Sequence, residues 1–217
     1  MKRNKRTFLE ALIVAMIIFW SGIMVGIFFE DSRIAEITKF YSDSETSISD
    51  FNLASELIFG SNLDCDKLTK EGIIFADRIY EEAKKLERYD NSNKITDRVV
   101  HLHKRYDLLR TLLWNKLIEN KEKCNSTTNT IVYFYDYLTT DFDQISTQNT
   151  MANYLTKVKR ENFDKVILLP IAGDTGILST EILEEVYGIT NRPAILVNEK
   201  HKIDRLEDLN SLESLLN

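Results

Sequence analysis

The chemistry that the two cysteines can perform depends on where the fold places them. Cys65 and Cys124 are the only thiols among 217 residues, which excludes a cysteine-rich zinc site and a four-cysteine iron–sulfur centre. Two thiols can close one disulfide, or they can serve thiol–disulfide exchange. The choice depends on the elements that position them.

Other reactive side chains form weaker patterns. His101 and His103 are two residues apart on a predicted helix and face different directions, so we expect solvated or flanking-face histidines rather than a metal pair. Asp141 and Asp143 stand at a predicted helix start, where acidic residues usually act as caps. Ser179 has no evident histidine and acid partners. The sequence therefore predicts no catalytic residue, metal or cofactor.

The charge of the chain is unevenly distributed. Residues 1–10 hold four basic side chains and one acid, whereas the whole chain carries −6. The remainder is therefore strongly acidic. Because the phosphate backbone supplies most nucleic-acid affinity, we exclude DNA and RNA as partners.

A membrane span is predicted at residues 11–29, a run of 19 uncharged residues. A helix of this length covers about 28 Å, close to the hydrocarbon thickness of a bilayer. A cleaved signal peptide is the alternative, but the run is long and lacks a small-residue cleavage site. We therefore expect a retained single-pass anchor in the cell membrane.

The charges on either side of the span predict its direction. The basic head, residues 1–10, precedes the span and Glu30-Asp31 follows it, so the positive-inside rule places the N-terminus in the cytoplasm and everything after the span outside. Gly22 and Gly26 form a GxxxG pattern that can pack two spans together. The pattern is common by chance, so the absence of a dimer is an equal expectation.

Residues 30–124 are predicted to be helical outside the membrane. The first segment, residues 31–60, has the 3-4 apolar spacing of a coiled coil, and a break is expected at the serine-rich residues 42–47. Two further helices, at about residues 66–89 and then to about residue 120, are joined by a turn at 90–93 and form an antiparallel hairpin. The apolar seam of the first segment contains Ile34, Ile37, Tyr41, Ser44, Ile48, Phe51, Ser55 and Ile58.

The hairpin brings the two cysteines to one end. In an antiparallel pair, facing residues have a constant sum of positions, and Cys65 and Cys124 average to the hairpin turn. Outside the cytoplasm such a pair is expected to be bridged, with two unpaired thiols as the alternative. A bridge would close a loop of about 60 residues, worth about 4 kcal/mol at most by chain entropy.

Residues 125–217 change to an alternating pattern of strands and helices. Asn125 opens an N-glycosylation sequon. Strands are predicted at 130–135, 165–170, 193–198 and around 202–203, and helices at 144–162, 180–187 and 206–216. The fold class is therefore α+β overall, with an α/β domain at the C-terminus.

This β-α-β-α-β-β-α order, with the segment YGITNRPAILVN at 187–198, resembles the thioredoxin-like and DsbA-like proteins. The resemblance implies a thioredoxin fold over residues 130–217 and a cis-proline at Pro193. It also implies a groove beside that proline, where Arg192, Tyr137 and Thr140 would lie. Such a groove engages an extended peptide by backbone pairing.

The sequence departs from that family at the reactive position. Thioredoxins carry Cys-x-x-Cys after the first strand, but here residues 137–144 contain no cysteine, so exchange has no nucleophile. We expect a redox-inactive binding or scaffold module with an unknown protein or peptide partner. The alternatives are an oxidoreductase that uses Cys65 and Cys124, and a helical stalk that self-associates.

Overall fold

The structure is a computed structural model that describes residues 2–59, 65–90, 97–124 and 126–216. The chain divides into two compact units, residues 1–40 and 41–217, and each is described by itself. The predicted sequon residue, Asn125, lies outside the described residues. So does most of the predicted 90–93 turn.

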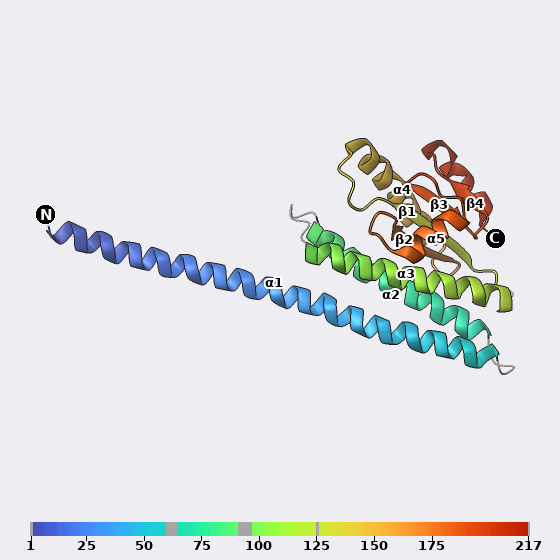
Figure 1. The fold of residues 1–217 in the computed structure, drawn as a ribbon, viewed down its shortest axis with the longest axis horizontal. Helices are drawn as coiled ribbons and strands as arrows, with labels where there is room; N and C mark the ends of the chain where they lie inside the picture. Colours follow the sequence, from blue (N-terminus) through green and yellow to red (C-terminus); the bar gives the residue numbers. More distant parts are fainter. Residues whose placement is uncertain (1, 60–64, 91–96, 125, 217) are drawn as a thin grey trace. The chain divides into compact units, whose positions relative to one another are not determined.

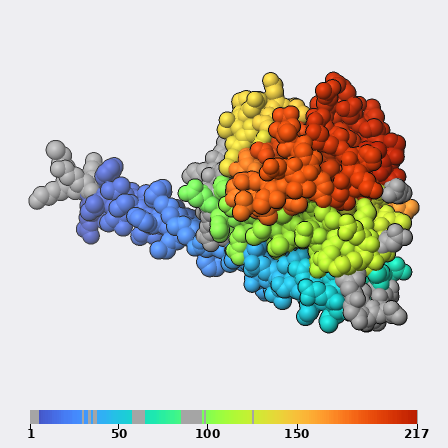
Figure 2. Space-filling model, turned by 45° about the vertical axis from the view of Figure 1, so that its right-hand side comes forward, coloured from blue at the N-terminus to red at the C-terminus, as the bar shows by residue number. Residues whose placement is uncertain are grey.

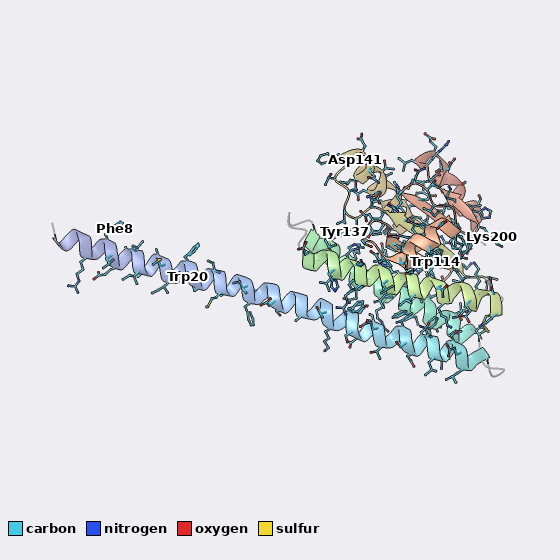
Figure 3. All side chains as sticks on the ribbon, viewed as in Figure 1. Phe8, Trp20, Trp114, Tyr137, Asp141 and Lys200 are labelled. Carbon is cyan, nitrogen blue, oxygen red and sulfur yellow. A yellow bond between two sulfur atoms is a disulfide. The ribbon has the colours of Figure 1, made fainter. Side chains whose placement is uncertain are left out.

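The first unit is helical and consists of the N-terminal part of α1 (Lys2–Phe59). Its segment Arg6–Phe29 is long and apolar enough to cross a membrane, with a mean hydropathy of 2.6 and no buried side chain. Phe8 and Trp20 project from the bare helix in Figure 3. Nothing lies within 4 Å of the Cβ positions of Gly22 and Gly26, so their role in packing stays a prediction.

The predicted break at residues 42–47 was wrong, because α1 runs through it without interruption. Serine and threonine disfavour helices when their hydroxyls compete for backbone groups. Here the hydroxyls bond within the helix instead, each to the carbonyl four residues earlier: Thr46 to Ser42, Ser47 to Asp43 and Ser49 to Glu45, at 2.9–3.2 Å. The segment also packs one face against the rest of the second unit, which stabilises it further.

The predicted seam of α1 is buried where the structure describes its side chains. Tyr41, Ser44, Ile48, Phe51 and Ser55 are all at most 7% exposed. The Tyr41 ring meets Tyr106 edge-on, and Ser55 donates to Asn120 at 2.6 Å. The side chains of Ile34, Ile37 and Ile58 lie outside the described set.

Helices α2 (Cys65–Asp90) and α3 (Asp97–Cys124) lie antiparallel, as Figure 1 shows. Their apolar stripes are buried, with Ile79 and Leu113 fully inaccessible. Cys65 is the first residue of α2 and Cys124 the last of α3, and the predicted disulfide joins them with a Cα–Cα distance of 5.6 Å.

The sheet has four strands in the order β2-β1-β3-β4. β1 (Asn129–Tyr135) pairs in parallel with β2 (Val166–Ala172) and antiparallel with β3 (Ala194–Val197), which pairs antiparallel with β4 (His201–Ile203). β2 is nearly continuously apolar because it is buried on both faces.

Each face of the sheet has its own helical cover (Figure 1). Ile131 and Tyr133 point toward α4 (Phe142–Glu161) and the C-terminal helix. The alternate residues Val132 and Phe134 point the other way, where Phe134 meets Trp114 of α3 at 5.9 Å between ring centroids. The same side carries α5 (Leu178–Val186), whose Thr180 hydroxyl lies 3.2 Å from that of Thr111.

The last element differs from the predicted α-helix, because residues 206–215 form a 3-10 helix, η1 (Leu206–Leu215). Its leucines recur every third residue, at 206, 209, 212 and 215. A 3-10 helix has three residues per turn, so this spacing aligns them on one face. Leu209 and Leu212 are consequently buried against the sheet.

Removing the disulfide should lower the stability of the folded protein. We predict that Cys65→Ser with Cys124→Ser lowers the free energy of unfolding by up to about 4 kcal/mol, because a loop with a sequence separation of 59 becomes unconstrained when unfolded. Urea denaturation of the detergent-solubilised chain, followed by far-UV circular dichroism, measures the change. Reductant should destabilise the wild type but leave the double variant unaffected; sensitivity of both would contradict the prediction.

Candidate functional site

Three loops meet where the predicted groove should lie, beyond the carboxyl ends of β1 and β2. They are residues 136–141 after β1, residues 173–177 after β2, and the loop that leads into β3. The parallel pairing of β1 with β2 brings the first two loops together, and the antiparallel β3 starts at the same edge. Arg192–Pro193, at the start of β3, is a cis peptide bond. Clustered loops of this kind commonly carry function.

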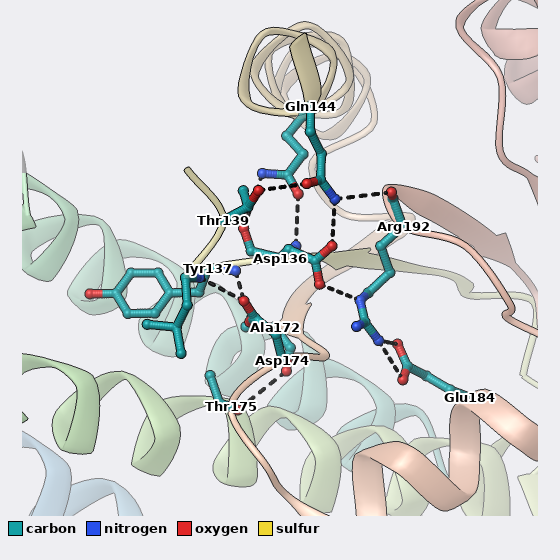
Figure 4. A network of polar contacts seen from close by, with 11 residues as sticks. Asp136, Tyr137, Thr139, Gln144, Ala172, Asp174, Thr175, Glu184 and Arg192 are labelled. Carbon is teal, nitrogen blue, oxygen red and sulfur yellow. Dashed lines mark hydrogen bonds and ion pairs between the residues drawn. The ribbon is translucent and has the colours of Figure 1, made fainter. Parts of the chain in front are cut away.

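A closed set of ion pairs occupies the centre of this edge (Figure 4). Arg192 donates from Nε to Asp136 at 2.5 Å and from Nη1 to both carboxylate oxygens of Glu184 at 2.9 Å. The Glu184 side chain is only 9% exposed, and that of Arg192 is 27% exposed. One guanidinium thus links β1, α5 and the β3 loop.

Burial and pairing act in opposite directions on these charges. Burial raises the pKa of the Glu184 carboxyl above its ordinary value, and the Arg192 guanidinium partly offsets that rise. Burial by itself would lower the pKa of Arg192, but its bonds to Glu184 and Asp136 outweigh it and raise that pKa. The arginine is therefore a fixed cation rather than a proton donor.

Gly173 makes room for the ion pairs. A Cβ atom at this position would collide with the Arg192 side chain and with Glu184 Oε1. Its backbone N–H donates to the Tyr135 carbonyl at 2.9 Å, so the loop cannot retreat without losing that bond. Glycine is required here for space.

Two glutamines of α4 complete the network, and Gln144 reaches it from above in Figure 4. Gln144 donates to Asp136 at 2.5 Å and to the Arg192 carbonyl at 3.3 Å, and it accepts from the Thr139 hydroxyl at 2.6 Å. Gln148 pairs with the backbone of Asp136 in both directions. Asp141 caps α4 by accepting from two backbone N–H groups, which agrees with its predicted role.

Tyr137 turns away from the predicted groove toward α3. Its ring stacks on His103 at 3.7 Å between centroids, while its backbone N–H donates to Asp174 at 2.8 Å. The labelled Tyr137 in Figure 3 lies over the start of α3 accordingly. Of the four predicted groove residues, only Arg192 and Pro193 lie together, and Thr140 is exposed on the loop.

Of the two positions expected for His103, solvated or on a flanking face of the helix, the first was wrong. This histidine is 5% exposed, with Nδ1 lying 3.1 Å from Asp107 and Nε2 lying 3.2 Å from the Tyr135 hydroxyl. Asp107 also accepts from Arg110 at 3.1 Å. The four-residue spacing of His103 and Asp107 on one helix was the available signal, since it places them on the same face.

The disulfide belongs to another part of the molecule. His103 contacts this edge of the sheet, and Cys124 follows it by 21 residues on α3. At 1.5 Å per residue the two positions are about 30 Å apart. The described residues also contain no group of three or more metal-ligating side chains.

The most conspicuous exposed feature of this layer is α5. Leu178, Ile182 and Val186 recur every fourth residue and are 70%, 50% and 69% exposed. The buried side of the same helix is polar, with Thr180 and Glu184 inside. Figure 2 shows the orange surface of α5 against the light-green surface of α3. The apolar face of this helix therefore points to solvent.

No protein-family model matches the chain, and comparison with curated proteins and with solved structures finds no match.

Arg192→Met tests how the ion pairs hold this edge. Because Arg192 is partly exposed, its loss should cost on the order of 2 kcal/mol at pH 7.5, less than breaking a fully buried pair. The folded-state pKa of Glu184 lies above its unfolded value, so the folded protein binds more protons as the pH falls. The cost should therefore shrink at pH 5, where Glu184 is more readily protonated.

Denaturation at both pH values measures this difference. Arg205→Met is the matched control, because Arg205 is exposed and its loss should change the unfolding free energy by about 0.5 kcal/mol or less. An equal cost of Arg192→Met at both pH values would mean that an unpaired carboxylate is not its cause.

Proposed function

We propose that the protein is a single-pass, membrane-anchored binding module whose C-terminal domain is thioredoxin-like and inactive in disulfide exchange. The N-terminus lies in the cytoplasm and residues 30–217 lie outside. The exposed apolar face of α5 carries this proposal, because large exposed apolar side chains that share one face mark interaction sites.

The thioredoxin-like assignment is supported by topology. The seven elements from β1 to η1 follow the order that the resemblance implies, and the strands are arranged β2-β1-β3-β4 with β1 and β2 parallel. The cis bond before Pro193 precedes β3, where the family has one.

Inactivity is supported by what occupies the reactive position. Residues 137–144, where the family places its cysteines, contain none, and Gln144 at the end of this stretch donates to Asp136, which also accepts from Arg192. The Arg192 carbonyl, next to the cis bond, already accepts from Gln144. A peptide pairing at that carbonyl would have to displace the amide, so α5 is the better candidate surface.

The chemistry of α5 indicates what it would bind. Glu181 and Glu185 are exposed beside the apolar stripe, and exposed Leu108 and Leu112 flank Thr111, the α3 residue that touches α5. An apolar segment flanked by lysine or arginine fits this surface, because its charges complement the two glutamates.

Two alternatives remain distinct from this proposal. An oxidoreductase would use the disulfide at the end of the hairpin, far from the cis-proline edge. A purely helical stalk would give α5 no role and would not account for the exposed apolar face of this helix.

Charged substitutions on α5 test the binding surface. Ile182→Glu with Val186→Glu should reduce recovery of co-purifying proteins from solubilised membranes at least tenfold, because two apolar anchors are replaced by like charges facing Glu181 and Glu185. Quantitative mass spectrometry measures the recovery, and Phe163→Glu, at a similarly exposed apolar position on the turn after α4, should leave it unchanged.

Unchanged recovery from the α5 variant would contradict the proposal. The oxidoreductase alternative predicts insulin reduction by the wild type that Cys65→Ser with Cys124→Ser abolishes; the proposal predicts none from either.

The orientation is tested by protease accessibility. Because the basic head precedes the span, an epitope after residue 217 should be removed by protease added to spheroplasts, whereas an epitope before residue 1 should survive until the membrane is permeabilised. The opposite pattern would reverse the topology.

A further inference from the structure

A groove between α1 and α2 has no role in the function proposed above. It has a volume of about 500 Å³, and its floor is apolar, formed by Phe51, Ala54, Leu68 and Phe75. Ile74 lines it and is 42% exposed. All of these residues belong to the unit 41–217.

Charged side chains form the rim of the groove. Asp50 projects from α1, and Lys67, Glu71 and Arg78 project from α2. All four are exposed, and none has a hydrogen bond or ion pair within the part of the chain that the structure describes. Elsewhere on this bundle charges pair readily, as Arg105 does with Glu45 and Lys159 with Asp77.

The two walls differ in charge. Residues 41–59 of α1 contain four acids and no lysine or arginine, whereas two of the three rim charges from α2 are basic. Packing α1 against another α1 would bring like charges together. Packing α1 against α2 of a second copy would place Asp50 opposite a basic wall.

The positions of the lining residues along the groove agree with packing of α1 against α2 of a second copy. α1 and α2 run antiparallel (Figure 1), and Phe51 packs over Gly72, where a Cβ would meet its ring at 3.3 Å. Ser47, Asp50 and Arg78 therefore line one end of the groove, and Ala54 and Lys67 line the other. At the end lined by Asp50 and Arg78 the two walls carry opposite charges, so a two-fold axis parallel to the groove brings the acid of each copy toward the arginine of the other.

We propose that the α1/α2 groove is the contact surface of a parallel homodimer, in which α1 of each copy packs on α2 of the other. Asp50 of each copy then pairs with Arg78 of the other. The parallel orientation rests on the single-pass anchor of the proposed function, since copies anchored in one bilayer share one orientation. The evidence for the groove does not depend on the anchor, because it comes from the contacts between α1 and α2.

Charge exchange in the full-length chain tests the pairing. Donor- and acceptor-labelled copies reconstituted in phosphatidylcholine vesicles should show energy transfer that rises with protein-to-lipid ratio. Asp50→Arg alone and Arg78→Asp alone should each raise the apparent dissociation constant at least tenfold, because each places two like-charge contacts in the dimer. Mixing the two variants should restore wild-type transfer, because both contacts then join an arginine to an aspartate.

Controls separate this surface from other sources of association. Asp164→Arg reverses an exposed charge on the turn after α4 and should leave the transfer unchanged. A wild type that stays monomeric, variants that associate as well as the wild type, or a mixture that fails to regain transfer would each overturn the proposal. Loss of transfer only in Gly22→Leu with Gly26→Leu would also overturn it, because the contact would then lie in the span. Protease accessibility reports the anchor's orientation separately, so failure of the topology is distinguishable from failure of the dimer.

Discussion

Burial of both faces of the small sheet is the constraint from which the rest of the second unit follows. Ile131 and Tyr133 face one way along β1, and Val132 and Phe134 face the other, yet all four are at most 3% exposed. A sheet that is apolar on both faces needs two covering layers. The layer of α4 and η1 comes from the C-terminal segment, but α5 alone is too short for the opposite face, and α3 supplies the missing cover through Trp114. α2 also protects β2, which is an edge strand of the sheet. Asp77 of α2 forms an ion pair with Lys159, which neighbours β2.

Patterns that depend on one element were predictable from the sequence, whereas contacts between distant elements were not. The buried seam of α1, the α2–α3 hairpin and the positions of the four strands along the chain follow from local periodicity and turn residues. The disulfide is the exception, because the antiparallel register of two consecutive helices sets its cysteines at one end. The hydroxyl groups at 42–47 were misjudged because their effect on a helix depends on whether they bond within it. The leucine spacing of η1 was visible in the sequence, but it also fits part of an α-helical face. Asp136, Glu184 and Gln144 could not be assigned to one network, since they approach Arg192 only through the sheet topology.

The polar network at the candidate site acts as a structural joint. Arg192 connects the loop after β1, the helix α5 and the loop before β3, and its Nε and Nη1 groups are held by two carboxylates. The ion pairs that fix these loops close the site. They also hold α5 in place, because Glu184 anchors the helix from its buried side. The exposed leucine, isoleucine and valine of α5 are therefore held on a surface that need not reorganise before it meets a partner. Preorganisation of that kind reduces the entropy lost on association.

The disulfide also determines how tension would travel through the chain. The polypeptide enters the α2–α3 loop at Cys65 and leaves it at Cys124, and the two Cα atoms are 5.6 Å apart. In the anchored, partner-bound state that we propose, a pull between the two ends of the chain would therefore pass through the sulfur–sulfur bond rather than along the covalent chain of the hairpin. The residues between the cysteines carry no load, so α2 and α3 cannot be drawn out end to end while the bond is intact. Under tension the disulfide transmits the force past the hairpin. Reduction of the bond would allow the chain to extend by the length of the whole hairpin.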